Sequence, residues 1–165
     1  MKFTIAFAAL ATVAVSSVSA QYTNLVNAAA GPIQYAGSNY TINPSPMCIG
    51  REFCLTATGI LSAPLMEGAR LAIIGKYLGR HFYTDNGDLC SLLAASGTPC
   101  PIPAGAFNLK LCRLIKPNLP PNWPVEYQFE ATNRDYSLIF AQKTPGYPGL
   151  NTTPSNPRLD AVICP

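Results

Sequence analysis

Residues 53–58 read Phe-Cys-Leu-Thr-Ala-Thr (FCLTAT), with an apolar residue at every second position. A period of two is typical of a half-buried β-strand, because successive side chains of a strand point to opposite faces of its sheet. We therefore expect Phe53, Leu55 and Ala57 to face the protein interior. This strand is the starting point for the rest of the fold.

Similar runs recur along the chain and are separated by turn-forming residues about every ten positions. The further strand candidates are residues 39–42, 71–75, 77–83, 107–111, 125–129 and 136–141. We expect Asp85-Asn86-Gly87 to break the chain, and residues 89–96 have the composition of a short helix. The sixteen prolines argue against a helical bundle, since each interior proline costs a helix about 3 kcal/mol. The pattern predicts an all-β antiparallel sandwich or barrel.

The N-terminus has the order of a secretory signal peptide, which we assign to residues 1–20. Lys2 precedes an apolar core over residues 3–15, and small residues end the segment at Ala20. This core is shorter than the about 20 residues that span a bilayer, so a membrane anchor is disfavoured. We expect the protein to be secreted or held in the lumen of the secretory or vacuolar pathway.

The remaining chain has the length of one domain. Residues 21–37 lack a clear period and are expected to form a loosely held arm before a domain over residues 38–143. Residues 144–165 are rich in proline and turn formers, and we expect an extended tail that Cys164 ties back to the body.

The composition excludes two classes of protein. Charged residues are 12% and hydrophobic residues 48%, unlike an intrinsically disordered chain. The chain has eleven Lys and Arg against eight Asp and Glu, and no three basic residues are consecutive. It therefore lacks the basic stripe with which a nucleic-acid-binding protein contacts the phosphate backbone. We expect no nucleic-acid partner.

The six cysteines are an even number, which in an oxidising compartment predicts disulfides. A zinc site is disfavoured, because the chain has no C-x-x-C motif and its only histidine is His81. We expect no metal and no cofactor. Asn39-Tyr40-Thr41 and Asn151-Thr152-Thr153 are glycosylation sequons, which makes Asn39 and Asn151 candidate acceptors.

Catalytic signatures are weak. A hydrolase needs a nucleophile paired with a base, and the single histidine, His81, lies in a strand-like run. G-x-S-x-G, a Walker loop and a dinucleotide fingerprint are absent from the sequence. Glu52 with Glu67, or Glu126 with Glu130, are the candidate carboxylate pairs, but the second pair alternates with inward residues and is expected to face solvent. We expect a protein that is not an enzyme, and its many inward apolar side chains suit either an apolar ligand or a solid core.

A set of short motifs resembles the ML lipid-recognition family, which contains the Niemann-Pick type C sterol carriers and the fungal phosphatidylglycerol/phosphatidylinositol transfer proteins. In order, they are Gly50, Phe53, Leu55, Gly59, Glu67-Gly68-Ala69, Asp88-Leu89-Cys90, Cys100-Pro101-Ile102, Gly105 and Leu119-Pro120-Pro121. The resemblance covers residues 39–141 and looks closest to the fungal proteins, whose strand pattern aligns without a gap onto Gly50 to Gly59. It implies an immunoglobulin-like antiparallel β-sandwich of about seven strands that holds one lipid between its sheets.

The cysteines depart from the family pattern. The resemblance and the intervening turn formers Gly97 and Pro99 both predict a Cys90–Cys100 disulfide. The family cysteines before the first strand and in the last strand are missing, and Cys54, Cys112 and Cys164 stand elsewhere. Cys54 pairs with Cys112 and Cys48 with Cys164 if the strands of Cys54 and Cys112 are neighbours. The alternative pairs Cys48 with Cys54 and Cys112 with Cys164, and we favour the first only slightly.

The resemblance also implies that the inward side chains line a lipid cavity. The candidate lining residues are Phe53, Leu55, Ala57, Leu71, Ile73, Phe107, Leu109, Val125, Tyr127, Phe129, Leu138 and Phe140. The alternative is that these side chains meet and fill the space, as interiors usually do. Ala57 and Gly75 leave room either for a ligand or for a neighbouring ring. Trp123 lies between prolines at a strand start, where it serves as a rim residue or packs under the turn.

We therefore expect a secreted, monomeric lipid-binding and lipid-transfer protein that carries a sterol or phospholipid between membranes through transient membrane contact. The alternative is a secreted lipid-recognition or cell-surface interaction protein of the same fold without transport activity.

Overall fold

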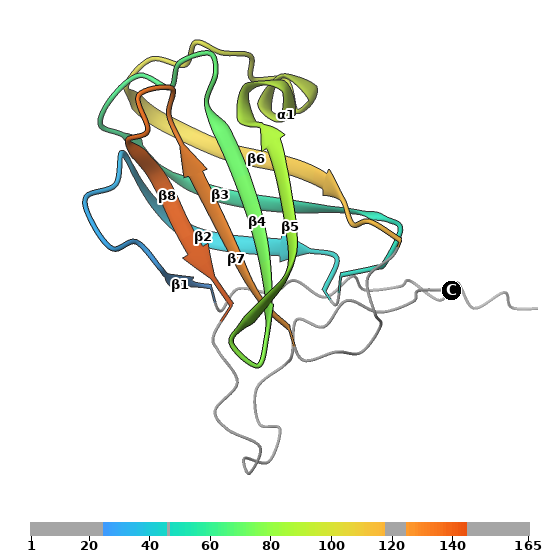
Figure 1. Ribbon diagram of the computed structural model, residues 1–165. Helices are drawn as coiled ribbons and strands as arrows, with labels where there is room; N and C mark the ends of the chain where they lie inside the picture. Colours follow the sequence, from blue (N-terminus) through green and yellow to red (C-terminus); the bar gives the residue numbers. More distant parts are fainter. Residues whose placement is uncertain (1–24, 46, 118–124, 145–165) are drawn as a thin grey trace, which may run out of the picture.

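The fold is an antiparallel β-sandwich, seen in a computed structural model that describes residues 25–45, 47–117 and 125–144 (Figure 1). One sheet has the order β1-β8-β7-β4-β5 and the other has the order β2-β3-β6. The elements are β1 (Val26–Asn27), β2 (Tyr35–Asn43), β3 (Glu52–Leu61), β4 (Arg70–Tyr77), β5 (Arg80–Asp88), α1 (Leu89–Ala95), β6 (Gly105–Leu114), β7 (Val125–Thr132) and β8 (Leu138–Lys143). The predicted all-β sandwich is confirmed, with the two-residue β1 as an eighth strand.

The strands of the two sheets cross one another, and α1 closes one end of the sandwich (Figure 1). In β3 the period of two is kept, so Phe53, Leu55 and Ala57 are buried as expected. Leu55 lies opposite Leu111, and Ala57 lies opposite Leu109, on the central pairing of β3 with β6. The alternating residues of β7 are buried in the same way from the other sheet. The core therefore lies between the sheets.

The short helix begins where its sequence allows. The Asp88 side chain caps its N-terminus by accepting a hydrogen bond from the Ser91 backbone N–H at 2.6 Å, and this satisfies an otherwise unpaired donor. Leu89 and Leu93 are the buried side chains of this helix. Gly97 follows with a φ of 91°, a conformation that favours glycine.

The expected arm over residues 21–37 is wrong in its described part. β1 pairs with β8, and β2 already begins at Tyr35, which lies opposite Leu61 and has no exposed surface. The Tyr35 hydroxyl donates a hydrogen bond to the Phe107 carbonyl at 3.1 Å. Burial of this ring ties the segment to the sheets although its sequence has no period. The domain thus begins before Ser38.

The run over residues 77–83 is not one strand. Leu78 and Gly79 form a two-residue hairpin with φ values of 49° and 77°, and Tyr77 lies opposite Arg80. The expected break at residues 85–87 is also wrong, because these residues continue β5 and pair with β4. Tertiary pairing overrides the turn propensity of Asp, Asn and Gly here.

The last strand lies two residues later than expected. Tyr136 is exposed with a φ of 65°, in a turn that precedes β8. The β7–β8 register shifts beside this turn, between Ala131 and Thr132 at the end of β7. In the turn, buried Asn133 donates to the Pro64 carbonyl and accepts from the Met66 N–H, which ties the β7–β8 connection to the loop before β4.

Two disulfides are present among the described residues. Cys54 pairs with Cys112 across β3 and β6, the first of the two arrangements that the sequence left open, and Cys90 pairs with Cys100. Cys48 is disulfide-bonded, but the expected partner Cys164 lies outside the described residues. The expected signal peptide, Trp123, Asn151 and nearly all of the expected tail lie outside them as well.

Candidate functional site

The inward faces of both sheets form one apolar cluster that includes nearly all of the expected lining residues. Those in the cluster are Phe53, Leu55, Ala57, Leu71, Ile73, Phe107, Leu109, Val125, Tyr127, Phe129 and Phe140. Leu138 lies outside the cluster and is only partly buried, since it precedes the register shift in β7–β8 pairing. The sequence thus places eleven of the twelve together, and a bulge displaces the other.

These side chains contact one another across the interior. The rings of Phe53 and Phe129, from opposite sheets, lie 5.9 Å apart between centroids. The space beside Gly75 is taken by the neighbouring strand, because a Cβ there would lie 3.1 Å from the Phe82 ring and 3.1 Å from the Tyr83 Cβ. Gly75 therefore admits the Phe82 ring, one of the two uses expected for it.

One edge of the sandwich is closed by charges. Asp85 on β5 is buried, with 4% of its side chain exposed, and accepts two hydrogen bonds from Arg113 on β6, at 2.7 and 3.1 Å. Lys116, just after β6, lies 3.1 Å from the same carboxylate. We call this group, Asp85 with Arg113 and Lys116, the β5–β6 clasp, because it joins the edge strands of the two sheets.

The clasp shifts the pKa of Asp85 and that of the neighbouring Tyr83. The hydrogen bonds from Arg113 hold the pKa of the Asp85 carboxyl below its usual value, so the carboxylate stays charged. Burial raises the pKa of Tyr83 to about 12, and the negative Asp85 adds to this shift. The Lys116 ammonium lies 5.8 Å from the Tyr83 ring centroid, at the range of a cation–π contact.

The opposite edge of the sandwich is hollowed. A pocket of about 430 Å³ lies where β1 and β8 of one sheet meet β2 of the other. Its lining is Leu25, Asn27, Gly37, Ser38, Asn39, Tyr40, Thr41 and Gln142. None of these was expected as a lining residue from the sequence, because a β-bulge in β2 brings them together.

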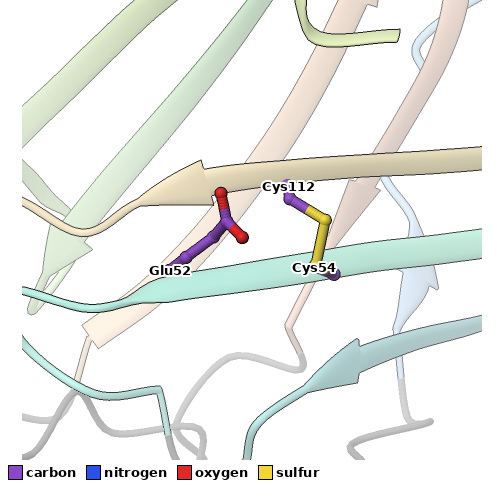
Figure 2. A group of neighbouring side chains, drawn as sticks. All are labelled: Glu52, Cys54 and Cys112. Atoms are coloured by element: carbon purple, nitrogen blue, oxygen red, sulfur yellow. A yellow bond between two sulfur atoms is a disulfide. The ribbon is translucent and has the colours of Figure 1, made fainter. Parts of the chain in front are cut away.

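A potential metal-ligating group is present among the described residues, but two of its ligands are already bonded. Figure 2 shows Glu52 and Cys54 on β3 beside Cys112 on β6, with the two sulfurs joined. A disulfide sulfur is not the thiolate that binds zinc. The group therefore does not fit a metal ion.

The candidate catalytic residues lie at the surface. His81 is exposed on β5. The Glu126 carboxylate lies 3.8 Å from the Lys143 ammonium, and Glu130 accepts a hydrogen bond from Gln128 on the outer face of β7. Glu52 and Glu67 are exposed. None of these four carboxylates lines the pocket between β1, β8 and β2.

A profile of the ML domain family matches residues 33–140, which include both sheets from just before β2 to within β8. The chain belongs to the ML domain family. The solved structure of a Niemann-Pick type C2 protein from the Japanese carpenter ant superposes with a TM-score of 0.57 at 17% identity, covering 73% of this chain and 97% of that one. This supports the immunoglobulin-like fold expected of an ML domain.

Two further comparisons add nothing to the family assignment. The C-terminal domain of wzt gives a TM-score of 0.37 at 13% identity, covering 84% of this chain and 88% of that one, and we draw no argument from it. The search of curated proteins finds no match. Within the described part of this ML domain, no helix is long and apolar enough to cross a membrane.

Proposed function

We propose that this protein is a secreted lipid carrier that binds a sterol or a phospholipid between its two sheets and transfers it between membranes. The observation that carries the proposal is that the ML domain match coincides with the two sheets and their shared apolar interior. The two disulfides support an oxidising compartment such as the secretory pathway. The nearness to the fungal phosphatidylglycerol/phosphatidylinositol transfer proteins is part of the proposal, and it keeps a phospholipid beside a sterol among the candidate ligands.

The physical basis is apolar transfer without a covalent step. Each lipid methylene that leaves water contributes about 0.8 kcal/mol, so an acyl chain or sterol ring gains by entering the interior. Release then needs a membrane that offers a comparable environment. Because Phe53 and Phe129 contact each other across the interior, loading requires the sheets to separate and such contacts to be replaced by contacts with lipid.

The β4–β5 hairpin is the proposed membrane contact. Leu78 at its tip is 66% exposed and is held out in the left-handed region, where leucine is uncommon. Phe82 is also exposed, and Arg80 and His81 lie between the two apolar residues. Apolar side chains beside the cationic Arg80 suit an anionic lipid surface, which takes up both.

The experiment that tests lipid carriage places a large side chain in the interior, on the inner face of the three-stranded sheet. Ala57 and Leu109 lie opposite each other on β3 and β6, and both are buried. We expect Ala57→Trp or Leu109→Trp to abolish transfer of a fluorescent lipid between vesicles while the protein stays folded and secreted. Ile60→Trp is the matched control, because Ile60 is on the same strand and 60% exposed. Normal transfer by both inner variants, or failure of both to fold, would contradict the cavity assignment.

A second candidate function rests on the contact of the Phe53 and Phe129 rings across the interior. Rings that meet between the sheets favour a solid core, as in a secreted recognition or cell-surface protein of the same fold without transport. Organic-solvent extraction of the purified protein separates the two. A stoichiometric sterol or phospholipid in the extract supports the carrier, whereas a lipid-free protein with affinity for a glycan or protein supports recognition.

A further inference from the structure

The pocket between β1, β8 and β2 is lined by both polar and apolar groups. Among the described residues its lining combines amide and hydroxyl side chains with Leu25 and Gly37, and it contains no Lys, Arg, Asp or Glu. An anionic phosphate would have to leave water there without a cation to pair with, which is costly. Uncharged hydroxyl or ester oxygens would keep hydrogen-bond partners. The chemistry of the pocket thus favours an uncharged oxygen-bearing group.

A bulge in β2 places a tyrosine in the lining of this pocket. The register with β3 shifts between Ser38 and Thr41, and Asn39 has a φ of 53°. Tyr40 is consequently buried, with 7% of its surface exposed. Its ring contacts Phe140 of the apolar cluster at 6.2 Å between centroids, and a Cβ on Gly37 would collide with its hydroxyl. The Tyr40 side chain therefore joins the pocket to the apolar interior.

The Tyr40 hydroxyl lies near the Gln142 side-chain amide, but no described residue offers it a hydrogen bond of adequate geometry. Burial, followed by the nearby Tyr35 hydroxyl, raises the pKa of Tyr40, while the Gln142 amide acts in the opposite direction. The phenol is thus neutral and can donate a hydrogen bond. Buried hydroxyls are normally paired, so an unpaired one beside a pocket is an unmet hydrogen-bonding capacity.

The buried Gln142 side chain faces the same region. Its backbone lies opposite Phe129 in the β7–β8 register, so its side chain shares the inward face of that sheet. An amide offers both donors and an acceptor. A ligand oxygen in the pocket would therefore meet two different hydrogen-bonding side chains, one from each sheet.

We propose that this pocket binds the uncharged, hydroxyl-bearing end of the carried lipid, with the Tyr40 hydroxyl hydrogen-bonded to a lipid oxygen. The inference rests on the proposed lipid carriage and makes it specific: the preferred ligands are a sterol or a diacylglycerol rather than an anionic phospholipid. The apolar part of the lipid would continue past the Tyr40 ring into the cluster between the sheets.

The test is Tyr40→Phe, which removes only the hydroxyl, with Tyr35→Phe as the matched control. Tyr35 contacts the Tyr40 ring but does not line the pocket, and its hydroxyl is already bonded to the Phe107 carbonyl. Equilibrium binding is measured for cholesterol, 5α-cholestane, dioleoylglycerol, dioleoylphosphatidylglycerol and free glycerol. Thermal unfolding of each lipid-free variant is measured in parallel.

We expect the wild type and Tyr35→Phe to bind cholesterol about two- to tenfold more tightly than cholestane, the effect of one hydrogen bond, and Tyr40→Phe to show no preference. Lipid-free Tyr40→Phe should unfold at the same temperature as the wild type or higher, because no bond is lost, whereas Tyr35→Phe should unfold at a lower temperature.

An unchanged sterol preference in Tyr40→Phe would overturn the inference while leaving lipid carriage intact. Phosphatidylglycerol binding as tight as that of diacylglycerol, and equally weakened by Tyr40→Phe, would overturn the preference for an uncharged group. Tyr40-dependent binding of free glycerol at comparable affinity would assign the pocket to a soluble polyol. If none of the lipids binds to any variant, both the inference and the proposed function fail.

Discussion

Asp85→Asn is the substitution that most directly tests the β5–β6 clasp. The change keeps the shape of the side chain but removes the charge that Arg113 and Lys116 share. Three charge-assisted contacts are affected, and such bonds contribute about 1.5–3 kcal/mol each when well formed. Arg113 is 30% exposed and Lys116 49%, so both cations regain water when the charge is lost. We therefore expect a net loss of only about 2 kcal/mol of unfolding free energy at pH 7.

This loss corresponds to a fall in melting temperature of roughly 6–12 °C for a domain of this size. Its pH dependence follows from the direction of the pKa shift. Because the folded pKa of Asp85 lies below its unfolded value near 3.8, the stabilisation is complete above that value and is lost as the pH falls through the folded pKa. The difference between the wild type and Asp85→Asn should therefore be constant from pH 7 to about 5 and narrow below pH 4.

The assay is urea or thermal unfolding followed by circular dichroism at a series of pH values. Asp135→Asn is the matched control, because Asp135 is exposed and, within the described part of the chain, its hydrogen bonds stay in its own turn, with Ser137. It should shift the midpoint little. If Asp85→Asn unfolds no earlier than this control, or if its deficit persists unchanged at low pH, then the clasp does not hold the two sheets as argued.

Three further changes test other parts of the fold. Leu78→Asp should slow lipid transfer from anionic vesicles without changing lipid affinity in solution, whereas Ile60→Asp, at a comparably exposed apolar residue, should leave the transfer rate unchanged. Gly59→Ala should lower the unfolding free energy by about 1–3 kcal/mol in urea titrations, because the added Cβ would lie 2.7 Å from the Gly37 Cα of β2. Gly31→Ala is its control and should change the unfolding free energy little, because a Cβ there would have no atom within 4 Å. Replacing both Cys54 and Cys112 by Ser should destabilise by up to about 4 kcal/mol, since the bond closes a loop with a sequence separation of 58; an unfolding midpoint equal to that of the wild type would show that the crosslink is not formed.

The sheets could be predicted where local pattern and tertiary environment agree. The alternations around Leu55, Leu109 and Tyr127 predict buried faces, and all three residues are buried. The pairing of Cys54 with Cys112 depended on which strands are neighbours, so the sequence alone left two arrangements open. A period of two reports which face a residue occupies but not which strand lies beside it.

The features that escaped prediction depend on partners that are distant in sequence or on irregular backbone. Asp85 lies in a sequence typical of a turn, and the cations that pair with it as a buried strand residue are distant, with Arg113 lying 28 positions away. Tyr40 faces inward and Leu138 leaves the core because bulges shift the register at each position. Tyr35 belongs to the core although its segment has no period. Bulges and long-range ion pairs have no sequence signature comparable to alternation.

The two long edges of the sandwich are joined by different contacts. We therefore expect the two sheets to separate by a hinge motion about one edge. Asp85 on β5 is held by Arg113 and Lys116, on and just after β6 of the other sheet, so this edge acts as a hinge. On the side of β1 and β2, aromatic contacts such as that of Tyr40 with Phe140 leave a pocket between the strands. When a lipid separates the sheets, distances measured between spin labels should lengthen more across the β1–β2 edge than across the β5–β6 edge. Swelling of this molecule would then be a rotation about one side rather than a uniform expansion.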